Sequence, residues 1–262
     1  MTPIDERGER AGIRRAPPPF RVAVVETVHY VTPYMARVSI IGDSLKDMEP
    51  PEPAASIRML LPMPGASELP EISWNGNEYR LADGSRPVIR TFTPGTFDPG
   101  TGRLDIEVVL HDAGATSSWV SSAAPGSVAA VSGPGRGYIV DQDSSTYLLA
   151  GDATALPAIC QLIEAISVET TLQVIVEVND DTARMELPSH PTLDQRWVIQ
   201  RPQEKPGSAL LPAIRDAGIT GDATIWAAGE AAAMHDIRNY FLEERGFDRR
   251  RVTVRGYWKH SR

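Results

Sequence analysis

The sequence predicts an antiparallel β-barrel of six strands with Greek-key connections, followed by an α/β domain with a parallel, doubly wound sheet. The first half holds short runs rich in Val and Ile, separated by long loops and one good helix, which favours a small barrel. The second half alternates buried strands with apolar-faced helices, which is typical of a parallel sheet. A polar break at Asp141–Ser145 separates the patterns. We therefore expect a mobile leader over residues 1–19 and domains over 20–141 and 142–262.

Composition and charge exclude several classes of protein. With 262 residues, 42% of them hydrophobic and 23% charged, the chain has the composition of an ordinary globular protein long enough for two domains. Its net charge of −8 argues against nucleic acid or an anionic membrane as the main partner. The single cysteine, Cys160, excludes an internal disulfide and a CxxC metal site. No apolar run approaches the ~20 residues of a membrane span, so we expect no membrane insertion. Together with the single cysteine, which fits a reducing compartment, this favours a cytoplasmic protein. We expect a monomer.

The leader shows no targeting pattern. It carries four arginines but also three acidic residues, and it ends in Pro17-Pro18-Pro19. The acids argue against a transit peptide, and the segment lacks the apolar stretch of a secretory signal. We assign it no role.

The expected barrel strands share a rough alternation of apolar residues. They are Phe20–Tyr30, Met35–Gly42, Ser56–Leu61, the stretch Pro87–Pro94, Leu104–His111 and Val128–Ser132. Pro62–Arg86 is an excursion rich in Pro and Gly, and the turn formers of Thr96–Gly102 indicate a turn.

The run Arg90-Thr91-Phe92-Thr93 is the first candidate site. An extended backbone places Arg90 and Phe92 on one side and the two threonines on the other. This set suits a flat cofactor that carries phosphate: the aromatic covers the ring, the guanidinium binds phosphate with two prongs, and the hydroxyls hold polar atoms. The alternative is a strand edge with one solvated arginine.

A helix start follows the strand that ends at His111. Gly114, followed by Thr116 and Ser117, leaves free backbone N–H groups at the positive end of the helix dipole, where a pyrophosphate can bind. Ordinary capping by Ser or Thr is the alternative. The later run Gly133–Gly137 is no dinucleotide motif, because no helix follows it; we interpret it as a tight turn that places Arg136 at a pocket edge.

The second half alternates strands and helices. The expected strands are Tyr147–Ala150, Leu172–Val178, Arg196–Gln200, Ala223–Ala228 and Arg251–Tyr257, and the expected helices are Leu156–Ile166, Pro206–Ala217 and Glu230–Arg245, the last ended by Gly246. Ligands bind at the carboxyl ends of such strands. The candidates there are Gly151, Asp152, Thr154, Ala155, Glu177, Gly229 and Glu230.

Three further residue types bear on the function: a strand-end glutamate, the cysteine and the histidines. A carboxylate at the end of a strand, as at Glu177, can bond a ribose hydroxyl and would repel a 2′-phosphate, which favours NADH over NADPH; a solvated acid is the alternative. We expect Cys160 to pack in the core. We expect His111 to lie in a pocket. The other four histidines have no metal-ligand spacing, so we expect no metal bound by the protein itself.

Together these residues resemble the siderophore-interacting, flavin-binding proteins of the ferredoxin-reductase-like superfamily, over Phe20 to Trp258. The similar motifs are Arg90–Thr93, His111–Trp119, Ala150–Ile159, Ala228–Glu230 and Gly256–Lys259. Three positions depart from the family pattern. Phe92 stands where Tyr is usual, Pro94-Gly95 stands where a further Arg often follows, and Gly-Pro-Gly-Arg-Gly at 133–137 moves the cation by one residue.

The resemblance implies an FAD-bound reductase that takes electrons from NADH, NADPH or a ferredoxin and passes them to ferric siderophores, releasing ferrous iron. The expected FAD-binding residues are Arg90, Thr91, Phe92, Thr93, Val109, His111, Gly114, Thr116 and Ser117, all in the barrel domain. The carboxyl-edge candidates would bind NAD(P)H. Cations for an anionic siderophore are Arg58, Arg136 and Lys259, each of which is otherwise a solvated base.

Two alternatives stay open. One is a general flavin or ferredoxin-type reductase that supplies a partner oxygenase; the single cysteine excludes a fused iron–sulfur module. The other is a siderophore-binding protein without turnover, which would have no need of a redox cofactor.

Overall fold

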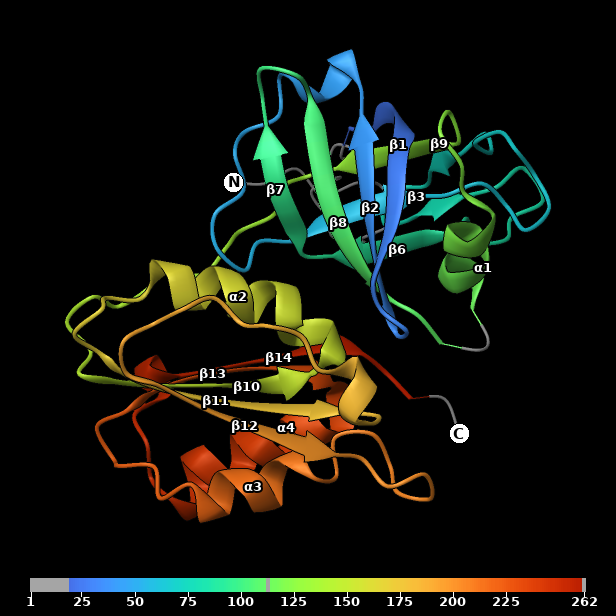
Figure 1. Cartoon of the computed structure of the whole chain (residues 1–262). Coiled ribbons are helices and arrows are strands. Elements are labelled where there is room, and N and C mark those ends of the chain that lie inside the picture. Colours follow the sequence, from blue (N-terminus) through green and yellow to red (C-terminus); the bar gives the residue numbers. More distant parts are fainter. Residues whose placement is uncertain (1–18, 112–113, 261–262) are drawn as a thin grey trace, which may run out of the picture.

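The described chain folds into two large sheets, one above the other in Figure 1, and a small two-stranded sheet. This computed structural model describes residues 19–111 and 114–260. A seven-stranded antiparallel sheet lies within residues 21–132, and a five-stranded parallel sheet lies within residues 146–258. Within the described ranges, no helix is long and apolar enough to cross a bilayer. The predicted fold class, an antiparallel barrel-like sheet followed by a parallel α/β sheet, is confirmed.

The antiparallel sheet is curled. Its strands are β1 (Arg21–Thr32), β2 (Met35–Ile41), β3 (Ile57–Leu60), β6 (Ile89–Phe92), β7 (Pro94–Asp98), β8 (Arg103–Val109) and β9 (Val128–Ser132). They pair in the order β6-β3-β9-β1-β2-β8-β7. The two edge strands, β6 and β7, are consecutive in the chain and are separated by Thr93 alone. The sheet therefore has to curl until its two edges meet.

Alternation along the strands builds the barrel core. Val38, Ile40, Leu104 and Ile106 are fully buried on neighbouring strands, and Trp119 of helix α1 (Ala115–Ser122) packs against the same cluster. Burying one such aliphatic side chain contributes about 1.5–3 kcal/mol, so the inner face dominates the stability of this half. The single helix expected among the barrel strands is confirmed.

The prediction of six barrel strands was wrong by one. Pro94–Asp98 forms β7 in the region that we expected to turn from Thr96 onward, because Phe97 packs against the barrel core and holds the segment extended. The turn itself is short. The Asp98 carboxylate accepts from the Gly100 amide at 2.8 Å and from the Thr101 hydroxyl at 2.7 Å, which closes it.

The excursion over residues 62–86 contains a small hairpin of β4 (Ser73–Trp74) and β5 (Tyr79–Arg80). Asn75 Oδ1 accepts from two amides of its turn. The Tyr79 ring meets Trp74 and Phe20 edge to face.

The parallel sheet has the order β12-β11-β10-β13-β14. Its strands are β10 (Thr146–Asp152), β11 (Thr171–Val178), β12 (Leu193–Ile199), β13 (Thr224–Glu230) and β14 (Val252–Trp258). Helix α2 (Leu156–Ala165) lies between this sheet and the barrel, and α3 (Leu210–Asp216) and α4 (Ala231–Asn239) cover the opposite face (Figure 1). The order reverses between β10 and β13, which is where such sheets bind ligands.

Helix α3 is shorter than expected and α4 ends differently. Gly207 has φ of +83°, so the chain cannot be helical there and α3 begins only at Leu210. Helix α4 continues into a π-helical turn over Tyr240–Glu244, and the predicted stop at Gly246 has φ of +68°.

Side chains from the second half bond the backbone of the barrel. Gln161 on α2 accepts from the Ala54 amide at 2.9 Å and donates to the Pro94 carbonyl at 2.5 Å. Arg255 on β14 donates to the carbonyls of Ala54 and Gly137, at 3.1 and 3.2 Å. These bonds join α2 to the start of β7, and they join both α2 and β14 to the loop at Ala54.

Candidate functional site

The register of β6 sorts its residues onto two faces. Arg90 pairs with Met59 and Phe92 with Ile57, both buried in the barrel core, whereas Thr91 pairs with Arg58. Cross-strand partners share a face of the sheet. The expected separation of Thr91 from Arg90 and Phe92 is therefore found.

Arg90 is available to a phosphate. Its side chain is exposed, and within the described ranges its one hydrogen bond runs to the neighbouring Ile89 carbonyl, at 2.9 Å. Phe92 is half-buried against the barrel core. Thr93 is buried, and burial raises the pKa of Tyr257 on β14 while the neighbouring Thr93 side chain opposes that rise. An exposed guanidinium beside a ring held at a sheet edge fits a phosphate-bearing flat cofactor such as FAD.

The start of α1 also fits an anionic group. The Gly114 cap has no side chain to accept from the first-turn amides, which leaves them to an external acceptor. His111 is exposed, and a Cβ on Gly114 would lie 2.4 Å from its Cε1 atom, so a larger residue at 114 would push this ring aside. Ser117 Oγ accepts from the His111 amide at 3.1 Å. Thr116 is buried and Val109 half-buried. Asp112 and Ala113 of the expected motif lie outside the described residues.

Asp152 joins three strand ends at the carboxyl edge of the parallel sheet. Its Oδ1 accepts from the amide and hydroxyl of Thr154, at 2.9 and 2.5 Å. Its Oδ2 accepts from the Glu230 amide and from Trp258 Nε1, both at 2.8 Å. Burial raises the pKa of Asp152, and these hydrogen bonds oppose the rise.

The two glycines of this edge are explained by close packing. A Cβ on Gly151 would lie 2.4 Å from the Ala228 carbonyl oxygen, and one on Gly229 would lie 2.5 Å from Asp152 Oδ2. The backbone of Gly229 also has φ of +154°. Both residues therefore let β10 and β13 approach each other, with or without a ligand.

Glu230 caps α4. Its Oε2 accepts from the amides of Ala232 and Ala233, at 2.6 and 3.0 Å, and its Oε1 accepts from the His260 amide at 3.1 Å. Burial alone would raise the pKa of Glu230, but the three amide bonds together lower it. Ala155 nearby is fully buried.

Glu177 has a structural environment that the sequence did not indicate. Its carboxylate is 2% exposed and accepts from the Gly207 amide and, at 2.8 Å, from the Ala209 amide. Burial raises its pKa. With both oxygens bonded to the loop that leads into α3, this geometry favours a structural role. The ribose interpretation, and with it the basis for preferring NADH, stays a prediction.

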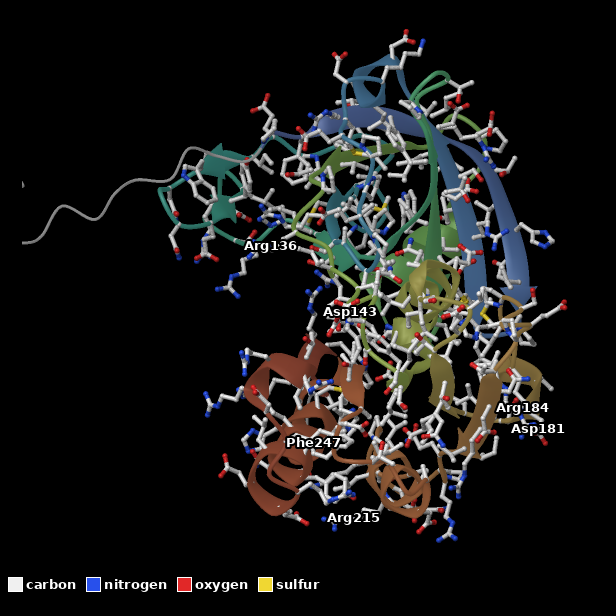
Figure 2. All side chains as sticks on the ribbon, turned by 90° about the vertical axis from the view of Figure 1, so that its left-hand side faces the viewer. Arg136, Asp143, Asp181, Arg184, Arg215 and Phe247 are labelled. Atoms are coloured by element: carbon white, nitrogen blue, oxygen red, sulfur yellow. The ribbon has the colours of Figure 1, made fainter. Side chains whose placement is uncertain are left out.

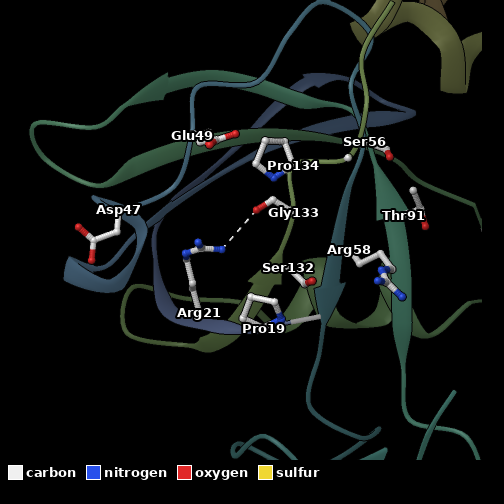
Figure 3. Close-up of a pocket in the computed structure, with 11 residues that line it drawn as sticks. Pro19, Arg21, Asp47, Glu49, Ser56, Arg58, Thr91, Ser132, Gly133 and Pro134 are labelled. Carbon is white, nitrogen blue, oxygen red and sulfur yellow. Dashed lines mark hydrogen bonds between the residues drawn. The ribbon is translucent and has the colours of Figure 1, made fainter. Parts of the chain in front are cut away.

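A cavity of about 600 Å³ opens on the outer face of the barrel (Figure 3). Its walls come from Pro19, Arg21, Asp47, Glu49, Ser56, Arg58, Thr91, Ser132, Gly133, Pro134 and Gly135. Arg58 and Thr91 are thus brought together in one wall. Small-molecule sites typically have ~300–1,000 Å³, so the cavity is large enough for one ligand.

The other two expected cations lie outside that lining. Arg136 is exposed on the connection between the two halves, and Figure 2 labels it. Gly135 and Gly137 on either side of it are bonded to the Ser56 carbonyl and the Glu52 carboxylate. Lys259 is exposed just after β14. The structure does not join these two to Arg58 through any bond in the described ranges.

Arg21, Asp47 and Glu49 are wall residues that sequence reasoning missed. Each is one charged residue in a strand start or loop, and their sequence separation gives no sign that they meet. Within the part of the chain that is described, no group of three or more His, Cys, Asp or Glu side chains is placed to hold a metal ion.

Comparison with known proteins identifies similar chains. Residues 24–138 match the siderophore-interacting FAD-binding domain, and residues 144–261 match the siderophore-interacting protein family. A crystal structure of a siderophore utilization protein from T. fusca is 29% identical with a TM-score of 0.81, covering 94% of this chain and 95% of that one.

Two curated relatives are informative. The chain is 25% identical to the ferric vibriobactin reductase ViuB of Vibrio cholerae, over 89% of this chain and 87% of ViuB. It is 30% identical to the mycobactin import ATP-binding/permease protein IrtA of Mycobacterium tuberculosis, over 91% of this chain and 26% of IrtA. The chain thus spans about a quarter of the length of the IrtA proteins it matches.

Proposed function

The chain belongs to the siderophore-interacting protein family with an FAD-binding domain, and from this we propose that it is an FAD-dependent ferric-siderophore reductase. Its electrons come from NADH or NADPH, or from a ferredoxin, and ferrous iron is released. The boundary between an FAD-binding barrel and an NAD(P)H-binding domain is proposed at residues 141 and 142. The similarity to a protein named ferric vibriobactin reductase supports the reaction class.

One observation carries the proposal. A single strand, β6, presents Arg90 and Phe92 toward one face and Thr91 toward the cavity that contains Arg58. A cofactor held by the first pair and a substrate held in the cavity would share that strand as a common wall. Sharing one strand would keep the two ligands close together, which favours the passage of electrons between them.

The FAD contacts follow from residue chemistry. Arg90 binds a phosphate oxygen, Phe92 covers the ring, and the first-turn amides at Gly114, Thr116 and Ser117 bind the pyrophosphate. Thr93, Val109 and His111 line the same cofactor. The half-buried Phe92 is held by the barrel core, so the ring it covers is oriented before substrate arrives.

The electron count requires a redox cofactor. Bound FAD supplies the exchange between a two-electron donor and one-electron acceptors. One NAD(P)H yields two electrons and one proton, and two ferric ions each accept one electron. The donor docks at the carboxyl edge that Asp152 organises, near Gly151 and Gly229.

The ferric chelate docks beside Arg58, with Arg136 and Lys259 as further cations. Siderophores hold ferric iron through hard, negatively polarised oxygens, which guanidinium and ammonium groups attract. Iron leaves after reduction because these oxygens favour the trivalent ion. No side chain need act as a general acid or nucleophile.

The test begins with the purified protein. We expect a yellow protein with one FAD per chain that NADH, NADPH or a reduced ferredoxin bleaches without oxygen. Adding a ferric siderophore should restore the colour and form two ferrous ions per nicotinamide, trapped by a ferrous-specific chelator. Bleaching without ferrous iron would instead support a reductase for another acceptor. A colourless protein that cannot be loaded with FAD would overturn the proposal.

A further inference from the structure

The cavity on the outer face of the barrel has walls of opposite charge. Figure 3 shows Asp47 and Glu49 on one side and Arg58 with Thr91 on the other, with Arg21 between them. The proposed reduction uses Arg58 alone of these charges. The acidic side needs an explanation, because carboxylates should weaken the binding of a purely anionic chelate.

The basic wall is set by strand register. Arg58 on β3 pairs with Thr91 on β6 and with Ser132 on β9, so one guanidinium and two hydroxyls form a row across three strands. Arg21, at the start of β1, donates to the Gly133 carbonyl at 3.3 Å, which holds its guanidinium against the cavity. This wall offers several donors to the oxygens of a ligand.

The acidic wall is held in place by the residue between its two carboxylates. Met48 is 2% exposed in the barrel core, as is Leu45 at 0%, and these two anchors hold the segment that presents Asp47 and Glu49. Both carboxylates are exposed, and neither forms an ion pair within residues 19–111 and 114–260. They are therefore available to a cationic group of a ligand.

We propose that this cavity selects ferric chelates that carry a cationic arm. The donor oxygens of the chelate face Arg58 and Arg21, and an ammonium group on its periphery faces Asp47 and Glu49. The identity of the ligand as a ferric chelate rests on the proposed function, whereas the charge selectivity rests on the cavity. A uniformly anionic chelate is attracted to one wall and repelled by the other.

The expected contribution of Asp47 and Glu49 to ligand affinity follows from the solvent exposure of their carboxylates. The two carboxylates face solvent, so each contributes about two- to fivefold in affinity at low salt. The preference should fall as salt is added, since the screening length is ~8 Å at physiological ionic strength.

Gallium complexes separate binding from reduction, because gallium(III) is not reduced under these conditions. The probes are gallium desferrioxamine B, which has a pendant ammonium group, and its N-acetylated derivative, which lacks that charge. Calorimetry with the FAD-loaded protein at low salt should show tighter binding of the ammonium form. In the double variant Asp47→Asn, Glu49→Gln the two dissociation constants should become equal. Asp194→Asn on β12, exposed and outside the cavity, is the matched control and should keep the preference.

Three results would overturn the proposal: equal affinities in the unmodified protein, a preference that survives the double variant, or no binding of either gallium complex. The FAD content and the reduction of a ferric siderophore are measured in parallel. If the unmodified protein shows no charge preference but still reduces a ferric siderophore, this inference is removed and the proposed function is left. A charge preference without any reduction removes the proposed function and leaves the selective cavity.

Discussion

The indole nitrogen of Trp258 donates a hydrogen bond to the buried carboxylate of Asp152, with 2.8 Å between Nε1 and Oδ2. The same oxygen accepts from the Glu230 amide. One side chain at the end of β10 therefore ties down the ends of β13 and β14, which carry the last segment of the described chain.

Replacement of Asp152 should destabilise the α/β half. In Asp152→Asn, one carboxylate oxygen becomes an NH₂ group facing N–H or O–H donors, and each donor left unsatisfied costs about 1–3 kcal/mol. Urea denaturation followed by tryptophan fluorescence measures the loss. Asp143→Asn, at an exposed position, is the control and should change stability little. Equal stability of both variants would contradict this role.

Arg90→Ala should weaken FAD binding. Loss of a charge-assisted phosphate bond costs about 1.5–3 kcal/mol, or roughly ten- to a hundredfold in affinity. Titration of the apoprotein with FAD measures it. Arg184→Ala, which removes a guanidinium paired with Asp181 on the other half, should bind FAD normally. Unchanged affinity in Arg90→Ala would mean that phosphate binds elsewhere.

Glu177→Ala should act on stability. It leaves the amides of Gly207 and Ala209 without their acceptor, at about 1–3 kcal/mol for each one that stays buried. We expect the ratio of activities with NADH and NADPH to stay the same, because both carboxylate oxygens already bind the backbone. A changed ratio, measured at saturating FAD, would restore the ribose interpretation.

The three expected siderophore cations should differ in effect. Arg58 lines the cavity, whereas Arg136 and Lys259 do not, so Arg58→Glu should raise the half-saturating concentration of an anionic ferric siderophore most. The increase should shrink with added salt and should be smaller for a neutral chelate. FAD content serves as the control for folding. Equal effects of all three variants would place the chelate over a wider surface than the cavity.

Cys160 should be unreactive near neutral pH. Burial raises its pKa from 9.0 to about 12, so the native protein holds a thiol where an unfolded chain would begin to form thiolate. An aromatic disulfide reagent at pH 8 should react slowly until urea is added. Because the folded pKa lies above the unfolded one, the thiol's contribution to stability is complete below pH 9 and is lost as the pH rises toward 12. Rapid reaction of the native protein would contradict the assignment.

Sequence periodicity predicted most elements because each of them is a local pattern. The alternation of β6 and the carboxyl-edge positions of Gly151 and Gly229 follow from spacing and strand order alone. Strand β7 was missed because its turn formers outweighed Phe97, whose burial depends on strands distant in the chain.

The bonding partners of the site residues could not be predicted. Trp258 and Glu230 meet Asp152 from 106 and 78 residues away, and the Glu177 partners lie in a loop 30 and 32 residues later. The local sequence around an acidic residue at a strand end is the same whether its carboxylate binds a ribose or a loop. The acidic wall of the cavity was equally hidden, since Asp47 and Glu49 meet Arg58 only after the sheet curls.

The meeting of β6 and β7 at Thr93 bears on aggregation. Both strands are sheet edges, and unpaired edges are templates for strands of other molecules. The second half covers this junction, because Gln161 donates to the Pro94 carbonyl and Tyr257 of β14 lies beside Thr93. A fragment of residues 20–141 would lack both Gln161 and Tyr257. Expressed alone, the barrel should therefore associate through these strand edges. In the whole chain, the α/β half covers the edges and prevents this association.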